Sequence, residues 1–503
     1  MKQSPLPQPE AKQRSLDPED WDSFRSVAHQ MVDRMIDQFQ SLDSRPVWTP
    51  PPSDLIEKWK TESTPQDGIG EQAAFDLFCQ EILPYGNGSW HPRFLGWVQG
   101  TGIPLGMMAD MLASGLNSHL AGFHTAPKWI ELQVIRWVTE WMGYPPDTSG
   151  LLTSGGSVAN VLALHVARFR SIQRCKEDRP FDPAQPPRKL RLYASDQVHG
   201  WIWKAIDLLG LDRDSMCTVP SIDGQLVLAS LKESIEKDRK DGWEPWCLVA
   251  SVGTVHTGAI DDLDACAALC EEEKLWFHID GAFGALARLV PEFQLQLSAI
   301  NQADSLAIDL HKWMYLPFEI GCVLIRDPEL HRAAFANRQV YMEETDRGLL
   351  AGGVPLADRG VELTRSFRAL KAWMCLHAYG IQRFSDCIER NIEQARLLAA
   401  AVESEPELEL VAKVHLNIVC FRYHPKKGSD LAEFDNRSLE VLNQEILLRL
   451  QESGIAVLSS TRIGDRFALR ASFTNHRTQD SDIRLIVQTI LQISRDPNLL
   501  QRV

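Results

Sequence analysis

The middle of the chain alternates short apolar runs with stretches whose apolar residues recur at helical spacing. Such alternation is typical of strands that are each followed by a helix. Runs of mainly apolar residues without regular alternation are expected of parallel strands that are buried on both faces. We therefore expect a mostly parallel, doubly wound α/β sheet over residues 104–365. Its predicted strands are 190–194, 247–251, 275–279, 305–308 and 321–325.

The two flanks differ from this centre. Residues 21–42 and 70–83 predict helices, but residues 1–103 carry too few apolar positions for a core of their own, so we expect them to pack on another surface, such as a second subunit. Residues 366–503 predict a smaller α+β domain that begins with a long helix. In its strand at 466–473, apolar and polar residues alternate, which predicts a half-buried strand.

Composition narrows the class of protein. The 503 residues are 44% hydrophobic with a formal net charge of −15, which allows two or three domains with large cores and argues against nucleic acid or an anionic membrane as a partner. We find no apolar stretch of the roughly 18 residues that span a bilayer, and no secretory signal. The ten cysteines form no Cys-x-x-Cys pair, which favours a reducing cytosol and gives no metal-binding pattern.

Two charged residues at strand ends carry the strongest chemical signal. Lys312 and Asp280 each follow an apolar run, at the edge of the sheet where open α/β proteins bind ligands. A lysine that can form a Schiff base and a carboxylate that can hold a pyridinium nitrogen protonated are the minimal set for pyridoxal 5′-phosphate, PLP. A structural salt bridge between the two residues is the alternative.

Three further strand ends offer groups that suit the same cofactor. The turn at 153–157, with Gly156 and Ser157 at the start of a predicted helix, could bind a phosphate, although an ordinary helix start explains it about equally well. His199 could stack on a pyridine ring, or could be a histidine at the start of a helix. Thr254 could contact a cofactor edge, or belong to an ordinary loop.

The motifs, taken in order, resemble the group II PLP-dependent amino-acid decarboxylases, the family of aromatic L-amino-acid, histidine, tyrosine and glutamate decarboxylases. The resemblance implies PLP fold type I, like aspartate aminotransferase, built as a homodimer with shared active sites in which residues 1–103 pack on the partner. The motifs that carry it are His91-Pro-Arg-Phe-Leu-Gly-Trp97, Thr153-Ser-Gly-Gly-Ser157, Ser195-Asp-Gln-Val-His199, His278-Ile-Asp-Gly-Ala282, His311-Lys-Trp313, Arg368-Ala-Leu-Lys371 and Leu469-Arg470.

The resemblance also implies roles by position. Lys312 matches the lysine that binds PLP, Asp280 the pyridinium partner, His199 the histidine stacked on the ring and Ala282 the small residue beneath it. Thr254 matches a cofactor contact. The phosphate is expected at Gly156, Ser157 and His311.

The substrate is expected at His91, Trp97, Phe123 and Arg470, with Phe123 supplied across the dimer and Arg470 near the substrate carboxylate. A solvent-facing arginine is the alternative for Arg470. Tyr341 lies where the family carries a mobile-loop tyrosine, here expected to reprotonate Cα. The sequence departs from the family's pattern at Thr254-Val-His256, at Asp309 and at Gly281-Ala-Phe283.

The function indicated is decarboxylation of an L-amino acid. The aromatic residues expected at the substrate pocket favour a substrate with an aromatic or bulky hydrophobic side chain. Other PLP reactions on the same fold remain as alternatives: an aldehyde synthase, a lyase, a transaminase, or a decarboxylase of the glutamate or aspartate type. The alternative that is not an enzyme is a catalytically silent homologue that acts as a binding or scaffold protein. We expect a cytoplasmic enzyme.

Overall fold

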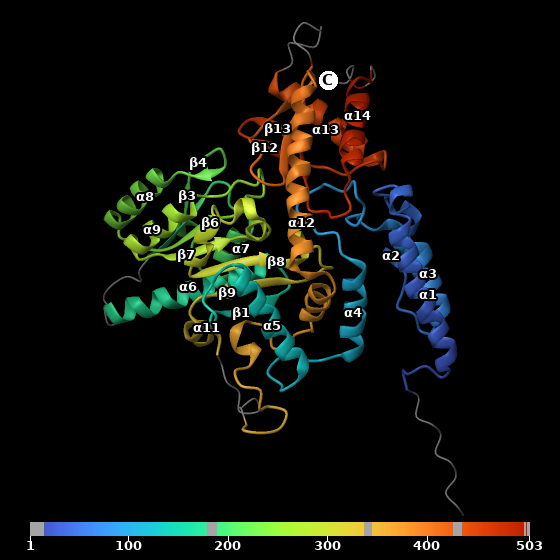
Figure 1. Cartoon of the computed structure of the whole chain (residues 1–503), viewed down its shortest axis with the longest axis horizontal. Helices are drawn as coiled ribbons and strands as arrows, with labels where there is room; N and C mark the ends of the chain where they lie inside the picture. Colours follow the sequence, from blue (N-terminus) through green and yellow to red (C-terminus); the bar gives the residue numbers. More distant parts are fainter. Residues whose placement is uncertain (1–14, 179–188, 337–344, 426–434, 497–498, 500–503) are drawn as a thin grey trace, which may run out of the picture. The chain divides into compact units, whose positions relative to one another are not determined.

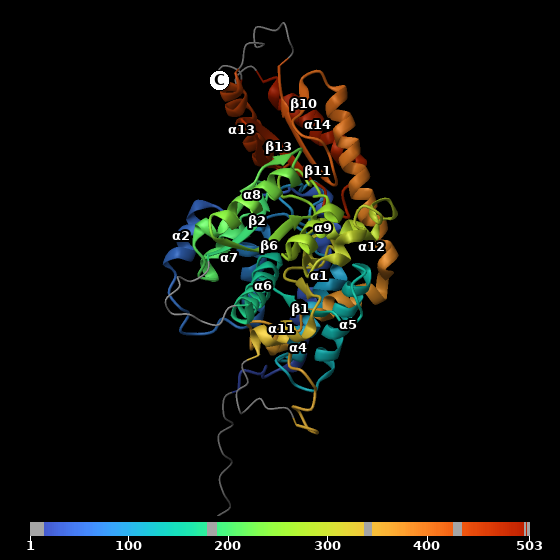
Figure 2. The same ribbon diagram turned by 90° about the vertical axis from the view of Figure 1, so that its left-hand side faces the viewer.

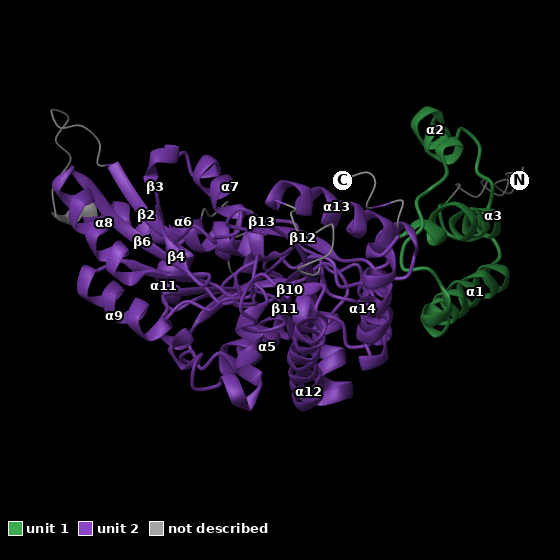
Figure 3. Ribbon diagram, turned by 90° about the horizontal axis from the view of Figure 1, so that it is seen from above, with its two compact units in different colours: residues 1–87 green, residues 88–503 purple. Residues whose placement is uncertain are grey.

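A computed structural model describes residues 15–178, 189–336, 345–425, 435–496 and 499, and the chain divides into two compact units, 1–87 and 88–503 (Figure 3). The first unit is helical within its described residues, as the sequence predicts. It contains α1 (Trp21–Gln40), α2 (Ser53–Thr61) and α3 (Glu71–Leu77), which continues through a π-helical turn at Phe78–Ile82 and a 3₁₀ turn at Leu83–Tyr85.

A seven-stranded sheet, called the large sheet here, forms the centre of the second unit (Figure 1). Its strand order is β1-β9-β8-β7-β6-β2-β3, and β9 is antiparallel to both of its neighbours while the other pairs are parallel. The fold class predicted from the sequence is therefore confirmed. The strands are β1 (Ser149–Thr153), β2 (Lys189–Ser195), β3 (Met216–Val219), β6 (Trp243–Ser251), β7 (Trp276–Asp280), β8 (Ser305–Asp309) and β9 (Gly321–Ile325).

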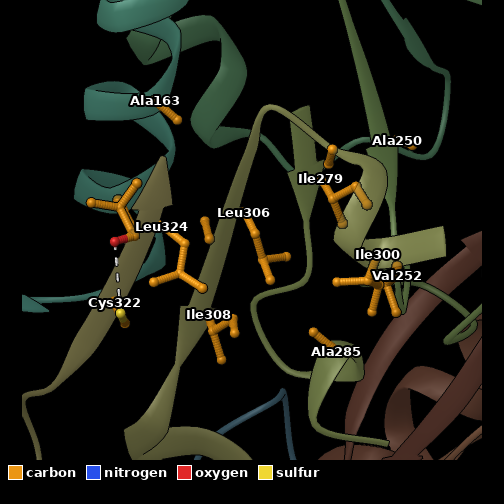
Figure 4. Close-up of a cluster of buried hydrophobic side chains, with 14 of the residues drawn as sticks. Ala163, Ala250, Val252, Ile279, Ala285, Ile300, Leu306, Ile308, Cys322 and Leu324 are labelled. Atoms are coloured by element: carbon orange, nitrogen blue, oxygen red, sulfur yellow. Dashed lines mark hydrogen bonds between the residues drawn. The ribbon is translucent and has the colours of Figure 1, made fainter. Parts of the chain in front are cut away.

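The central strands form because their runs are apolar on both faces. Every residue of β7, β8 and β9 is buried, which explains why these segments show no polar alternation. Figure 4 shows Leu306 and Ile308 of β8 beside Leu324 of β9, with Ala163 of helix α6 nearby. Small side chains such as Ala163 let the helix approach the sheet closely.

Helices surround the large sheet, and one of them also reaches the C-terminal sheet. Helix α12 (Ala369–Ser404) packs on α4 (Pro104–Leu116) and α5 (Ala126–Trp141) at one end and on β10 (Leu408–Leu410) and α14 (Asp480–Ser494) at the other (Figures 1 and 2). The predicted long helix at 370–379 is present, and after a break at Gly380, whose φ is 70°, a second helical segment continues to Ser404. The remaining helices of this part are α4 (Pro104–Leu116), α5 (Ala126–Trp141), α6 (Gly156–Asp178), α7 (Trp201–Leu208), α8 (Leu228–Lys240), α9 (Leu263–Glu273), α10 (Leu310–Trp313), α11 (Pro328–Phe335) and α12 (Ala369–Ser404), and a short β4–β5 ribbon (Ser221–Ile222, Gln225–Leu226) follows β3.

A four-stranded antiparallel sheet lies in the C-terminal part, in the order β10-β11-β13-β12. Its elements are β10 (Leu408–Leu410), β11 (Ile418–Tyr423), α13 (Asn436–Glu452), β12 (Ser459–Ile463), β13 (Arg466–Ser472) and α14 (Asp480–Ser494).

The prediction of a half-buried strand at 466–473 is wrong, because Arg470 and Ser472 are 3% and 1% exposed. The polar face of β13 is covered by other parts of the chain. The backbone N–H of Ser472 donates to the carbonyl of Leu95, and Arg470 Nε donates to the carbonyl of His256.

Candidate active site

A cavity of about 630 Å³ lies where β1, β2, β6, β7 and β8 end. These five strands run parallel to one another, so the segments that follow them meet at the same edge of the large sheet. The cavity has the size of a typical site for a small molecule or cofactor. Its lining includes residues 154–158 after β1, Gln197 and His199 after β2, 253–255 after β6, 280, 282 and 283 across the end of β7, and 309, 311 and 312 across the end of β8.

Lys312 reaches the cavity from α10, the short helix that follows β8. Leu310 and Trp313 of this turn are buried and anchor it, while the Lys312 side chain is 22% exposed. Its Nζ lies 2.7 Å from Asp309 Oδ2. The amine therefore faces the cavity and is held by a carboxylate from the last residue of the strand.

Asp280 ends β7 and is 8% exposed. Trp201 Nε1 donates to its Oδ2 at 2.5 Å, and the backbone N–H of Ala282 donates to its Oδ1 at 3.2 Å. A carboxylate has about four acceptor positions, so these two bonds orient Asp280 and leave room for a further cationic N–H. Sequence reasoning did not identify Trp201. Its position two residues after His199, at the start of an apolar helix, was the available signal.

The start of helix α6 forms the side of the cavity where a phosphate could bind. Gly156 is its first residue, and an added Cβ there would lie 2.7 Å from Asp309 Oδ2 and 3.4 Å from Ala282 Cβ. The glycine thus keeps a space open that a side chain would fill. Ser157 is exposed and lines the same space. Free backbone N–H groups and the helix dipole make such a site favourable for an anion.

His199, Ala282 and Thr254 also line the cavity. Burial lowers the pKa of His199, although the nearby Asp280 carboxylate opposes the change. A neutral imidazole suits stacking on an aromatic ring. The Thr254 hydroxyl accepts the N–H of Ala259 and lies 3.2 Å from the Thr257 hydroxyl, so it also stabilises its own turn.

His311 faces the same cavity beside Lys312. The backbone N–H of Ile320 donates to its Nδ1 at 3.2 Å, and its Nε2 lies 3.9 Å from Asp309 Oδ2. Burial is the main cause that lowers the pKa of His311. The ring is therefore neutral near pH 7, and Lys312 carries the positive charge at this end of the cavity.

A third histidine, His278, lies outside the cavity lining and was not assigned a role from the sequence. Its Nδ1 lies 2.8 Å from Ser305 Oγ and its Nε2 lies 2.7 Å from Asn160 Oδ1. Its ring meets the Trp201 ring edge to face. Burial lowers the pKa of His278 to about 4, so it is neutral and serves to position Trp201 and β7.

The residues predicted to bind substrate are not all at the cavity. Trp97 lines it and is 52% exposed, whereas His91, Phe123 and Arg470 are absent from its lining within the described part of the chain. Asn475 Nδ2 donates to the His91 carbonyl, and the Phe123 ring packs near the His119 ring. Tyr341 lies outside the described residues.

Arg470 is connected to Trp97 through one hydroxyl group. Arg470 Nη1 and the backbone N–H of Trp97 both donate to Ser459 Oγ, at 3.0 Å each. Burial lowers the pKa of Arg470 to about 10. The alternative of a solvent-facing arginine is excluded by its 3% exposure.

The His256 that departs from the family's pattern is bound to the same C-terminal sheet. Its Nδ1 lies 2.6 Å from Thr461 Oγ1, while its neighbour Val255 lines the cavity. Burial lowers the pKa of His256 below its usual value, and the positive charge of Arg470 also lowers it. The turn thus joins the large and C-terminal sheets.

The described residues fit PLP. The space beside Gly156 suits the phosphate, the oriented carboxylate of Asp280 suits the pyridinium nitrogen, and the partly exposed Lys312 side chain, which lines the cavity, suits a bond to the cofactor's carbonyl carbon. Within the described residues, no group of three or more His, Cys, Asp or Glu is arranged to hold a metal ion. The described helices include none that is long and apolar enough to cross a membrane.

Comparison with known proteins agrees with this chemistry. The profile of the pyridoxal-dependent decarboxylase conserved domain matches residues 53–424. An aromatic-L-amino-acid decarboxylase of Bacillus atrophaeus is 31% identical, over 95% of this chain and 97% of the relative. A phenylacetaldehyde synthase of Arabidopsis thaliana is 27% identical, over 93% of this chain and 95% of the relative. The crystal structure of Oryza sativa TDC with PLP and tryptamine has a similar fold, with a TM-score of 0.87 and 24% identity over 95% of this chain and 99% of that one.

Proposed function

The chain belongs to the pyridoxal-dependent decarboxylase family and is a PLP-dependent decarboxylase of amino acids, and on this premise we propose that its substrate is an aromatic or bulky hydrophobic L-amino acid. The observation that carries the proposal is the lining of the cavity, which combines Lys312 and Asp280 with the aromatic side chains of Trp97, Phe283 and Phe318.

Each charged group has a separate task in the proposed reaction. PLP, when bound, supplies a pyridinium ring that accepts the electron pair left when CO2 departs. Asp280 would hold the proton at the pyridine nitrogen, and Trp201 holds Asp280 in place. Lys312 would hold the cofactor in the absence of substrate. His199 would stack on the ring, and the start of α6 would bind the phosphate, since both line the cavity.

The choice of side chain follows from the charges at the cavity. Lys312 is the one Lys or Arg among the described residues that line it, and Glu319, which also lines it, is paired with Arg368 at 3.2 Å. Among the described residues that line the cavity, none offers a free cation to an acidic substrate side chain, which argues against the glutamate or aspartate type. Aromatic side chains, in contrast, gain from burial against Trp97 and Phe283.

The test compares kcat/KM for L-tryptophan, L-tyrosine and L-phenylalanine with that for L-glutamate and L-aspartate. We expect at least a hundredfold preference for an aromatic substrate, since a missing cation for a buried carboxylate costs several kcal/mol. A preference for either acidic substrate would contradict the assignment.

The alternative with a specific observation behind it is aldehyde synthesis, because a phenylacetaldehyde synthase is among the relatives. We propose that Tyr341 decides between the two outcomes by donating a proton to the substrate Cα, so that the product is the amine. The variant Tyr341→Phe should form less amine and, with oxygen, more aldehyde. Unchanged amine output from this variant would remove that role from Tyr341.

We also propose that Arg470 attracts the substrate carboxylate from behind Trp97. Its Nη2 is buried and has no hydrogen-bond partner within the described residues, so it can donate to an anion or to a water that contacts one. His91 and Phe123 would act in the assembled enzyme, with Phe123 supplied by the partner. The variant Arg470→Lys keeps a positive charge but loses the forked geometry, and should raise KM more than it lowers kcat.

A homodimer with shared active sites completes the proposal. In the first unit, exposed apolar residues include Trp21, Ile69 and Ile82, at 59%, 62% and 56% exposure, and exposed apolar surface of this kind marks interaction sites. We propose that residues 1–103 pack on the partner, with residues 104–365 as the PLP domain and 366–503 as the small domain. Light scattering should give twice the 56.7 kDa mass of the chain. A monomer that retains activity would contradict the shared site.

A cytoplasmic location is the remaining part of the proposal. Nine of the ten cysteines are described as free thiols, and six of these are buried, which suits a reducing compartment. Cell fractionation tests this location. We expect the activity in the cytoplasmic fraction, and its recovery in another fraction would refute the proposed location.

A further inference from the structure

Asp309 is a second carboxylate in the cavity that the tasks above leave unused. It is 2% exposed, its Oδ2 lies 2.7 Å from Lys312 Nζ, and its Oδ1 is buried without a hydrogen-bond partner among the described residues. Its backbone N–H donates to the carbonyl of Ala282, which fixes the end of β8 against the end of β7. The carboxylate is therefore held firmly while part of its accepting capacity stays free.

The groups around Asp309 leave Lys312 as its cation. From α10, His311 approaches to 3.9 Å but is neutral because it is buried. From α6, Gly155 and Gly156 bring a helix start without side chains against the carboxylate. An ammonium carries three N–H donors, and a buried hydrogen bond between opposite charges is among the stronger polar contacts in proteins.

We propose that Asp309 is a positioning residue that receives the ammonium of Lys312 when an incoming amine takes the place of Lys312 on the cofactor. The inference rests on the proposed function only in that Lys312 holds PLP. In the exchange, the carbon–nitrogen double bond to Nζ is replaced by one to the incoming nitrogen. An incoming ammonium gives up two protons, which together with the proton already on Nζ make the Lys312 ammonium, so the total charge is unchanged. Asp309 stabilises the charged, released lysine and so favours the exchange.

The experiment is a spectral titration of the PLP-loaded full-length chain with methylamine. Methylamine has neither a carboxyl group nor a side chain, so it can replace Lys312 without decarboxylation and without recognition of a substrate. The absorbance change that accompanies displacement of Lys312 gives the half-saturating methylamine concentration for the wild type and for Asp309→Asn, which keeps the shape of the side chain and removes its charge.

The control is Asp304→Asn, a partly buried carboxylate with a 27% exposed side chain, immediately before the other end of β8. Asp304 accepts the backbone N–H of Phe277 at 2.8 Å and lies 3.5 Å from Arg170, away from the cavity lining. We expect Asp309→Asn to need about tenfold or more methylamine, since hydrogen bonds to charged groups contribute on this scale. Asp304→Asn should stay within about twofold of the wild type under the same scale.

Equal half-saturation in Asp309→Asn and the wild type would overturn the inference, and so would easier displacement, which would indicate that Asp309 instead repels the cofactor phosphate. If Asp309→Asn does not retain PLP, a double-mutant cycle decides. Asp309→Asn, Lys312→Met and the double variant are unfolded in urea without cofactor, and coupled effects support the pair while additive effects overturn it.

The role of Asp309 and the proposed substrate reaction can be refuted separately. Loss of the methylamine difference with intact amine production from amino acids would refute only the role of Asp309. A clear methylamine difference in a protein that makes no amine from any amino acid would refute only the proposed substrate reaction.

Discussion

Replacing Gly156 by alanine should separate cofactor binding from folding. Gly156 is the first residue of α6, and the added Cβ would lie 2.7 Å from Asp309 Oδ2 and 3.4 Å from Ala282 Cβ. Alanine favours a helix over glycine by up to about 1 kcal/mol. The variant should therefore remain folded, while the methyl group fills the space in which the phosphate is expected.

The expected loss of PLP affinity in Gly156→Ala follows from these contacts. A carbon 2.7 Å from a carboxylate oxygen is closer than van der Waals contact, so Asp309 must shift, while the methyl group takes up space expected for the phosphate. Overpacking by one methyl group typically costs about 1–3 kcal/mol. At about 1.4 kcal/mol per factor of ten, the dissociation constant of PLP should rise roughly fivefold to a hundredfold.

The assay is equilibrium binding of PLP followed by absorbance, together with thermal unfolding of the cofactor-free chain. Gly200→Ala is the control, because Gly200 has a φ of −58° and an added Cβ there would meet no atom within 4 Å. Gly200→Ala should bind PLP like the wild type. Equal PLP affinity in the two alanine variants would refute the placement of the phosphate at α6.

Three further predictions test the supporting groups. Asp280→Asn keeps the donors Trp201 and Ala282 but loses the charge, and amine formation should fall about a hundredfold or more while PLP absorbance is retained. Burial lowers the pKa of His278 from 6.5 to about 4, so the unfolded chain binds a proton at this residue before the folded chain does as pH falls. The free energy of unfolding in urea should therefore fall by about 2 kcal/mol through this residue between pH 7 and 5, and by less in His278→Asn. Arg365→Met leaves the buried Glu131 carboxylate without its fully buried partner, so the free energy of unfolding in urea should fall by about 3–5 kcal/mol. Adding Glu131→Leu to the same chain should restore most of this stability.

The sequence was sufficient wherever a local pattern determines the structure. The strands at 247–251, 275–279 and 305–308 were predictable because continuous apolar runs are buried on both faces. Lys312 and Asp280 stood out because charged residues rarely end such runs without a function. The strand β1 was not predicted, since Ser149-Gly-Leu-Leu-Thr153 is short and lacks β-branched residues other than its final threonine.

The partners of the site residues could not be predicted, because they come from distant parts of the chain. Trp201 and Asp280 are 79 positions apart, and His278 and Asn160 are 118 apart. The environment of Arg470 was also hidden. Its strand alternates like a surface strand, but segments from the large sheet cover its polar face, so the hydrophobic pattern alone gave the wrong burial.

The fate of the substrate's carboxyl carbon shows directly whether the enzyme decarboxylates amino acids. PLP-loaded enzyme is incubated with L-amino acids labelled with ¹³C at the carboxyl group, and CO2, amine, aldehyde, keto acid and ammonia are quantified by mass spectrometry. The account predicts labelled CO2 and one new aromatic amine in equal amounts. Retention of the label in a keto acid, or labelled CO2 with an aldehyde and ammonia in place of the amine, would contradict it.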